Sequence, residues 1–338
     1  MKKLPIVHMS FEDLYGMLIG PIKSKLLLTG IEMKIFNYMG EPRSADALAE
    51  AIGAHPVSTK LFLDGLAASE LVLKKKGLYQ NAPVSQIFLV EKTPTYLGQV
   101  FTFWNEMWNP ALNDLPRLVR EGPPTPSPET DMGSEEICVQ AAFLANYERA
   151  GIAQQMAEIV SGLPEFPLFR RMLDLGGGPG IIGIAIVSAH PTIKGVIFDR
   201  PAVVKVTRSF IKEYEMEDRI EVLGGDFNHD SIGEGYDLIW ASSTLYFAKK
   251  DIDSILKKIY DALNPKGLFI SLHEGLIFER TKPDIMALSW MPTALMGQHL
   301  GFDQGVIADS MLRVGFKSVR SRTLDTPIGP MDLDIGRK

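Results

Sequence analysis

The stretch RMLDLGGGPGIIGIAIVSAHPTIKGVIFDRP, from Arg171 to Pro201, decides the fold of this chain. A short apolar run ends at Asp174 and Leu175, a glycine-rich loop follows, and a second apolar run ends at Asp199. Glycines in such a loop let a ligand approach the backbone closely. The pattern predicts a strand, a tight turn, a helix and a second strand, with a nucleotide-like ligand at the turn.

The same alternation of strands and amphipathic segments continues toward the C-terminus. Strands are expected at Arg171–Leu175, Lys194–Phe198, Ile220–Leu223, Asp237–Ala241 and Leu268–Leu272. Two later strands, near Lys317–Arg322 and Met331–Gly336, complete the expected sheet, and antiparallel pairing of these last two stays open. Strands that alternate with helices predict an α/β fold with a mostly parallel, doubly wound sheet.

The chain before this sheet has a different pattern. Ser44 precedes the helical segment ADALAEAI as an N-cap, and Val57–Ser69 is a second expected helix. LVLKKKGLYQN, from Leu71 to Asn81, has two apolar runs around a lysine-glycine turn, which is typical of a β-hairpin. Helix, turn, helix and hairpin predict a winged helix. The four prolines between Glu121 and Glu136 mark an exposed connection.

Composition limits the class of protein. The chain has 338 residues, 46% of them hydrophobic and 22% charged, which suits a globular protein of two domains. Apolar runs such as Ile181–Val187 are too short to span a bilayer, and no signal peptide is recognised at the N-terminus. A single cysteine, Cys138, excludes an internal disulfide and a cysteine-based metal site. We therefore expect a cytoplasmic protein with no membrane partner.

A winged helix raises the question of DNA binding. The second predicted helix carries Lys60 and Asp64, and no Arg, Asn or Gln that could read base edges. Residues 1–100 contain 11 Lys and Arg against 9 Asp and Glu, a net charge of +2, and the whole chain carries −6. These charges are too small for a surface that follows phosphates. We expect no nucleic-acid partner, and a ligand-responsive winged-helix regulator is the outside alternative.

The glycine loop can be tested against three ligands. A phosphate-binding P-loop needs Gly-Lys-Ser/Thr, but Gly180 is followed by isoleucine. A dinucleotide fingerprint is partly satisfied by the glycines and by Asp199. However, the carboxylate of Asp174 would repel a pyrophosphate, and Pro179 removes an N–H donor that phosphate binding would use.

S-adenosylmethionine fits the loop better, because it has no phosphate and carries an ammonium and a sulfonium. Asp199 could accept both ribose hydroxyls, Asp226 could meet the adenine amino group, and Phe227 could lie against the base. The alternative is that the glycines only form a turn and the aspartates cap helices, but open α/β sheets bind ligands at these strand ends. The expected cofactor-binding residues are Asp174, Gly176, Gly178, Gly180, Asp199, Arg200, Asp226, Phe227 and Ser242.

The motifs DLGGGPG, FDRP and GGDF and the order of the elements resemble the class I S-adenosylmethionine-dependent methyltransferases. More narrowly, they resemble the small-molecule O-methyltransferases of the hydroxyindole, caffeate and bacterial polyketide type. ALNPKGLF, from Ala262 to Phe269, matches a family motif, and Phe101–Leu118 matches its tryptophan-rich helix. The resemblance covers nearly the whole chain.

This resemblance implies a homodimer that uses S-adenosylmethionine, releases S-adenosylhomocysteine and needs no metal. It implies a winged-helix dimerisation domain at 1–122, a connecting loop and pocket helix at 123–150, and a catalytic domain at 151–338. The acceptor is expected to be a small aromatic or cyclic molecule, methylated at oxygen by in-line displacement.

One departure from the family pattern concerns the general base. The resembled enzymes place a histidine after the fourth strand, and Tyr246 stands there in this chain. Tyrosine, with an ordinary pKa of about 10, is a poor base at neutral pH, although it can orient an acceptor oxygen. Three alternatives stay open: an acceptor acidic enough to need no base; His273, Glu274 or His299 as the base; or methylation at carbon, as in tetrapyrrole C-methylating relatives. A chain that binds the cofactor without catalysis is a fourth.

The walls of the acceptor pocket are expected from aromatic and methionine side chains at helical spacing. Such stripes are core more often than pocket, but together they favour a broad, flat, apolar acceptor. The expected residues are Trp104, Trp108, Phe143, Tyr147, Trp290, Met291 and Met296.

Overall fold

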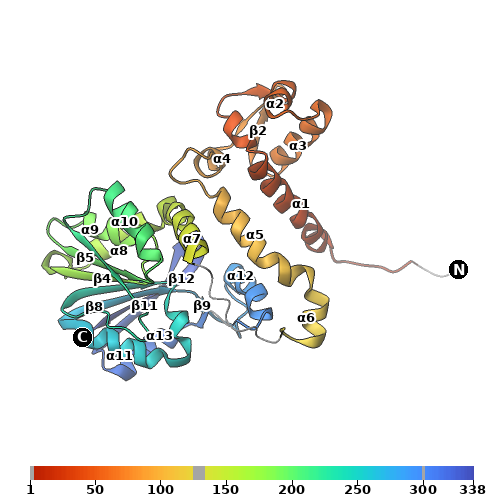
Figure 1. Ribbon diagram of the computed structural model, residues 1–338. Coiled ribbons are helices and arrows are strands. Elements are labelled where there is room, and N and C mark those ends of the chain that lie inside the picture. The colour runs from red at the N-terminus through yellow and green to blue at the C-terminus, as the bar shows by residue number, and fades with distance from the viewer. Residues whose placement is uncertain (1–3, 125–133, 299–300) are drawn as a thin grey trace. The chain divides into compact units, whose positions relative to one another are not determined.

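The computed structural model describes residues 4–124, 134–298 and 301–338. The chain forms two compact units, Met1–Thr102 and Phe103–Lys338, drawn in Figure 1 and described here one at a time. The boundaries at residues 122 and 150 that the sequence suggests stay a prediction.

The N-terminal unit contains the winged helix. The Ser44 side chain accepts a hydrogen bond from the amide of Ala47 and begins helix α2, as expected. Strands β2 and β3 pair antiparallel, and β1 pairs with β3. The elements are α1 (Glu12–Glu32), η1 (Ile35–Tyr38), β1 (Arg43–Ser44), α2 (Ala45–Ile52), α3 (Pro56–Ala68), β2 (Val72–Lys75), β3 (Leu78–Asn81) and α4 (Pro83–Phe88).

The second unit is built on a seven-stranded sheet with the order β11-β12-β8-β7-β4-β5-β6. Strands β4 to β8 are parallel, and β12 pairs antiparallel with both β8 and β11. The mostly parallel sheet is confirmed, and its last two strands are an antiparallel pair. The strands are β4 (Arg171–Leu175), β5 (Lys194–Asp199), β6 (Ile220–Gly224), β7 (Tyr236–Ser242), β8 (Leu263–His273), β11 (Ser318–Thr326) and β12 (Gly329–Arg337).

Helices cover both faces of this sheet (Figure 1). The helices of this unit are α5 (Gly98–Asn113), which begins in the first unit, α6 (Leu115–Glu121), α7 (Ser134–Tyr147), η2 (Glu148–Ile152), α8 (Ala153–Ser161), η3 (Phe166–Leu168), α9 (Ile181–Ser188), α10 (Val203–Glu213), η4 (Leu245–Asp251), α11 (Ile252–Ala262), α12 (Asp284–Leu295) and α13 (Val306–Val314). Two short strands, β9 (Gly275–Leu276) and β10 (Phe302–Asp303), pair in parallel. None of the described helices is long and apolar enough to cross a membrane.

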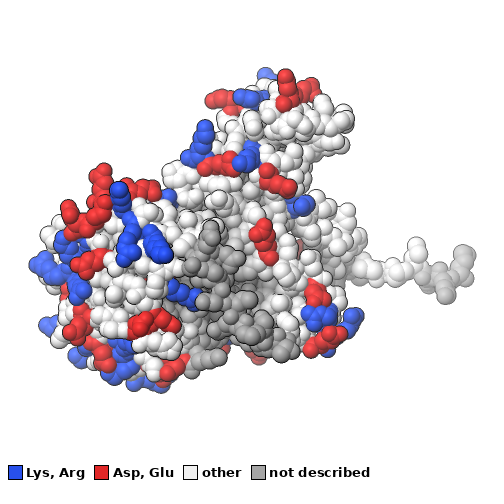
Figure 2. All heavy atoms as spheres, in the orientation of Figure 1, with Lys and Arg blue, Asp and Glu red and all other residues white. Residues whose placement is uncertain are grey.

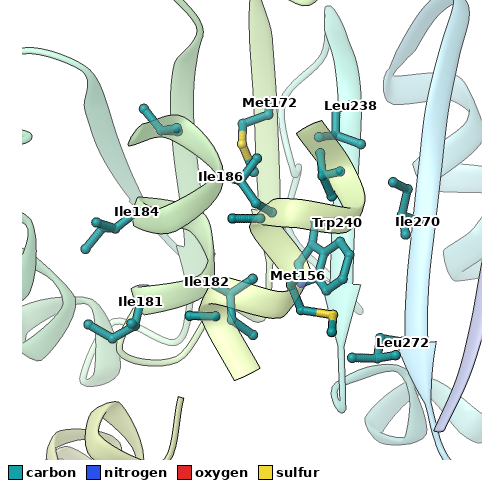
Figure 3. Close-up of a cluster of buried hydrophobic side chains, with 14 of the residues drawn as sticks. Met156, Met172, Ile181, Ile182, Ile184, Ile186, Leu238, Trp240, Ile270 and Leu272 are labelled. Carbon is teal, nitrogen blue, oxygen red and sulfur yellow. The ribbon is translucent and has the colours of Figure 1, made fainter. Parts of the chain in front are cut away.

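Two apolar cores hold the layers together. In the first, Met156 of α8 and the isoleucines of α9 pack with Trp240 of β7 and Leu272 of β8 (Figure 3). In the second, residues of α11 and α13 pack on the other side, around Phe269 of β8. Each large apolar side chain buried in this way contributes about 1.5–3 kcal/mol to folding. The two cores fix the strands, and with them the loops at the carboxyl edge of the sheet.

The tryptophan-rich helix differs from the sequence expectation. Instead of one helix over Phe101–Leu118, the chain forms α5 and α6 with a break at Asp114. Pro116, in the first turn of α6, lacks an amide hydrogen, and its ring would clash with the carbonyl oxygen four residues earlier in a continuous helix. Proline therefore ends the first helix and begins the second.

Candidate active site

The glycine loop joins β4 to α9 in a conformation that requires glycine. Gly176 has φ of +67°, and a Cβ atom there would lie 2.1 Å from Oγ1 of Thr244. Gly180, the N-cap of α9, has φ of +84°. Because left-handed backbone is unfavourable for other residues, the chain can turn this tightly only through glycine. The loop brings bare backbone to the carboxyl edge of the sheet.

Two of the expected carboxylates lie beside this loop. Asp199 accepts hydrogen bonds from the amides of Gly178 and Arg200, both at 2.7 Å. Asp174 is 3% exposed, and its Oδ2 atom has no hydrogen-bond partner of good geometry among the described residues. Burial raises the pKa of Asp174 to about 7, although the nearby amide of Gly183 lowers the pKa of this carboxyl, and the charge on Asp199 adds to the rise. Burial also raises the pKa of Asp199.

A third carboxylate, Glu148, was not predicted from the sequence. It begins η2, and its Oε2 atom accepts a hydrogen bond from the amide of Ile182 in α9 at 3.3 Å. Loss of hydration raises the pKa of Glu148 well above its ordinary value, and the charges on Asp174 and Asp199 raise it further. The site thus gathers three acidic groups.

Aromatic residues form the other half of the site. The ring of Tyr246 meets that of Trp290 edge to face, with 5.6 Å between centroids. Burial raises the pKa of both Tyr147 and Tyr246, and the charge on Glu274 adds to each shift. Glu274 is 5% exposed, and its Oε2 atom has no hydrogen-bond partner among the described residues. Burial raises its pKa as well. The tyrosines, Trp290 and Glu274 are therefore neighbours.

Helices α5 and α7 add to this aromatic group. The ring of Trp104 meets Tyr147 edge to face at 5.5 Å and stacks with Trp108 at 6.2 Å. The ring of Phe143 lies 5.2 Å from that of Phe103. Trp104, Trp108 and Tyr147 thus form one aromatic group, and their part in an acceptor pocket stays a prediction, as does that of Phe143.

Both ring nitrogens of His273 have hydrogen-bond partners within the protein. Its Nε2 atom accepts hydrogen bonds from the amides of Thr244 and Leu245, at 3.1 and 3.0 Å. Because Nε2 accepts from two amides, the ring carries its hydrogen on Nδ1, which lies 2.8 Å from Oγ of Ser271. Burial lowers the pKa of His273 to about 3. Both nitrogens are engaged, so the geometry gives His273 a structural role in holding η4.

Other expected residues lie in less enclosed surroundings. Asp226 is exposed and accepts hydrogen bonds from Asn228, which closes its own turn. Phe227 is 8% exposed and packs in the second apolar core. Met296 is 39% exposed. Ser242 and Met291 are half-buried, and the Arg200 guanidinium lies over the ring of Phe247 at 5.9 Å. His299 lies outside the described residues.

The acidic half of the site fits a cationic ligand. Neither Glu148 nor Asp174 forms a salt bridge within the part of the chain that the structure describes. Buried carboxylates need a countercharge or a proton, and S-adenosylmethionine offers an ammonium and a sulfonium. Within the same described ranges, no cluster of three or more His, Cys, Asp or Glu side chains has the arrangement of a metal site.

Two family models match the chain. An O-methyltransferase domain matches residues 143–291, which include the glycine loop, the three carboxylates and Tyr246. An O-methyltransferase dimerisation domain matches residues 16–91, which include the winged helix.

Relatives agree with these matches. The chain is 24% identical to the tetracenomycin polyketide synthesis 8-O-methyl transferase of Streptomyces glaucescens, over 93% of each chain. It is 27% identical to an uncharacterized protein of Methanocaldococcus jannaschii, over 73% of this chain and 65% of that protein. The structure of human N-acetylserotonin methyltransferase with S-adenosylmethionine has the same fold, with a TM-score of 0.80 at 21% identity over 98% of this chain and 99% of that one. The chain therefore belongs to the family of S-adenosylmethionine-dependent O-methyltransferases with an N-terminal dimerisation domain, and it is a methyltransferase of small molecules.

Proposed function

We propose that this protein transfers a methyl group from S-adenosylmethionine to the oxygen of a small aromatic or cyclic acceptor. The observation that carries this proposal is that an acidic group of residues lies next to an aromatic one. Buried carboxylates around Asp174 meet the aromatic cluster of Tyr147, Tyr246 and Trp290. A cationic donor suits the first surface, and a flat apolar acceptor suits the second.

The donor would lie along the carboxyl edge of the sheet. Asp199 has lone pairs beyond the two that its backbone bonds use, and these can accept the ribose hydroxyls. Asp174 would face the positively charged end, with the loop from Gly176 to Gly180 against it. Asp226, Phe227, Arg200 and Ser242 stay proposed partners of the adenosine. When bound, the donor supplies an activated methyl group, so the protein must chiefly orient the acceptor and exclude water.

Glu274 is the base that the geometry supports best. A raised pKa brings its proton affinity closer to that needed at neutral pH, and an unpartnered Oε2 atom can accept a proton. The acceptor hydroxyl would give its proton to Glu274 while its oxygen forms the bond to the methyl carbon and the carbon–sulfur bond breaks. Tyr246 would donate a hydrogen bond that orients the acceptor oxygen. Trp104, Trp108, Phe143, Met291 and Met296 stay proposed wall residues.

Methylation at carbon is the second candidate, and Tyr246 favours it. A tyrosine whose pKa is raised by burial does not take up a proton from an acceptor near neutral pH. A carbon nucleophile on a cyclic, tetrapyrrole-like acceptor would use the same aromatic surface. In that case Glu274 would remove the proton from carbon after the new bond has formed.

The partner of the N-terminal unit would be a second copy of this chain. Helix α1 exposes apolar side chains, including Leu14 at 67%, Met17 at 72% and Leu18 at 70%. An apolar surface of this kind is typical of a protein interface. DNA is disfavoured because Asp64 on α3 accepts hydrogen bonds from Lys60 and Lys74. Among the described residues drawn in Figure 2, blue and red side chains are interspersed on the visible face.

Calorimetry and mass spectrometry test this proposal. S-adenosylhomocysteine should bind one equivalent per chain, and NAD should give no binding heat. Donor labelled with a trideuterated methyl group is then offered with phenols, quinols and cyclic carbon nucleophiles. Transfer to a phenolic oxygen supports the proposal, and transfer only to carbon favours the second candidate. Binding of NAD without binding of S-adenosylhomocysteine would overturn both.

A further inference from the structure

Glu148 occupies a position that depends on an interruption between two helices. Ala150 has ψ of 22° and Gly151 has φ of 115°, so η2 is a kinked turn between α7 and α8. The kink brings the Glu148 carboxylate to the first turn of α9, where it accepts the amide hydrogen of Ile182. The positive end of the α9 dipole also favours a negative charge there.

Arg149, the residue after Glu148, contacts helix α10 through its guanidinium group. Arg149 pairs with Glu213 at 2.6 Å, donates to the hydroxyl of Tyr214 at 2.8 Å and lies over the ring of Phe210. All three partners belong to α10 or to its C-terminal end. Arg149 therefore compensates the charge of Glu213 and leaves Glu148 without a cationic partner among the described residues.

Glu148 also lies between the two halves of the site. The charges of Asp174 and Asp199 raise the pKa of Glu148 from one side, and the charges of Glu148 and Glu274 both raise the pKa of Tyr147 on the other. In methyl transfer the sulfonium must stand where donor and acceptor meet. The Oδ2 atom of Asp174 is buried and has no hydrogen-bond partner in the described part of the chain, which independently indicates that a cation belongs in this place.

We propose that Glu148 is a further donor-binding residue, and that it makes the site prefer the positively charged sulfonium donor over the neutral thioether product. This inference rests on the proposed use of S-adenosylmethionine. Both molecules carry the ammonium and the carboxylate, so they differ only in the methyl group on sulfur and in the positive charge that this group creates. A carboxylate beside the sulfur attracts the donor and loses that attraction once the methyl group has left. The same charge thus promotes product release.

Calorimetric titration of donor and product into three proteins tests this inference. In Glu148→Gln the affinity for S-adenosylmethionine should fall about tenfold, which is the effect of one partly shielded opposite charge, while that for S-adenosylhomocysteine changes less than about twofold. Glu213→Gln is the matched control, because it removes an adjacent carboxylate that is paired with Arg149. Both affinities should stay within about twofold of the wild type in that control.

Equal losses for the two ligands, or no loss, would overturn the inference. If Glu148→Gln does not fold, Glu148→Asp is tested instead. Its side chain is shorter by one methylene, so its carboxylate lies farther from the sulfur and the preference for the donor should shrink. An unchanged preference would then contradict the inference. Wild-type protein that binds neither ligand would instead contradict the proposed function, so the two failures are distinguishable.

Discussion

Asp174 and Asp199 end neighbouring parallel strands, and their two charges influence each other. Leu175, the last residue of β4, is paired with Phe198 in β5, so Asp199 lies one residue beyond this pair and Asp174 one before it. The charge on Asp199 contributes to the raised pKa of Asp174, after burial. The carboxyl edge of the sheet thus concentrates acidic groups whose raised pKa values favour protonation until a cation is present.

Donor affinity should rise with pH near neutrality. The pKa of Asp174 is about 7 in the free protein, so near that pH the carboxyl group is partly protonated. A cationic donor favours the charged form and displaces the proton. Calorimetry in buffers of different ionisation enthalpy, between pH 6 and 8, should detect proton release on binding. In Asp174→Asn that release should shrink and the affinity should fall.

The free energy of unfolding of the ligand-free protein should fall as pH rises, whereas donor affinity rises. Because the folded pKa of Asp174 is raised from an ordinary 3.8 to about 7, its protonated form favours folding below 3.8. That contribution is lost as pH rises toward 7. The raised pKa values of Glu148 and Asp199 act in the same direction. Thermal unfolding at constant ionic strength should show a smaller fall between pH 5 and 7 in Asp174→Asn; an equal fall would assign it to other groups.

Asp199→Ala should remove most of the cofactor affinity. Two hydrogen bonds between a carboxylate and ribose hydroxyls are worth about 3 kcal/mol or more together, which is roughly a hundredfold in affinity. Asp218→Ala, at an exposed position, is the control and should bind normally. An unchanged affinity for S-adenosylhomocysteine in Asp199→Ala would refute the ribose role, provided that circular dichroism shows a folded protein.

Tyr246→Phe should lower turnover and leave cofactor binding intact. The substitution removes one hydroxyl and keeps the ring that packs on Trp290. Loss of a hydrogen bond to a charged oxygen corresponds to about tenfold or more in turnover. Tyr260→Phe, on α11, is a control that should retain the wild-type rate. Equal rates for both variants would make Tyr246 a structural residue.

The two loop glycines should differ in their tolerance of alanine. At Gly176 a Cβ atom would meet Thr244 at 2.1 Å, whereas nothing lies within 4 Å of that position at Gly178. Both residues have positive φ. Gly178→Ala should therefore cost only about 1–2 kcal/mol of unfolding free energy for the left-handed backbone. Gly176→Ala should cost about 1–3 kcal/mol more for overpacking. Urea denaturation measures both, and equal costs would contradict the close packing of the loop.

The position of the loop could be predicted from sequence because its determinants are local. Glycines, a strand-ending aspartate and alternating apolar runs lie within thirty-one residues of each other. Glu148 could not be recognised in this way, because its role depends on a kink that carries it to α9. The one signal was Gly151, which interrupts an otherwise helical stretch.

His273 illustrates hydrogen bonds that the sequence does not reveal. A histidine at a strand end looked available for catalysis, but the backbone amides of Thr244 and Leu245 bind its ring. Those amides belong to the next loop along the sheet, and no local pattern predicts that they reach it. The grouping of Tyr147, Tyr246 and Glu274 from three separate elements was likewise beyond the sequence.

A crystal structure of the protein with S-adenosylhomocysteine tests the central claim most directly. The ribose hydroxyls should lie within hydrogen-bond distance of Asp199, and the sulfur should face Glu148 on one side and the group of Tyr246 and Glu274 on the other. A ligand whose ribose is bound elsewhere, or whose sulfur points away from Tyr246 and Glu274, would contradict the account.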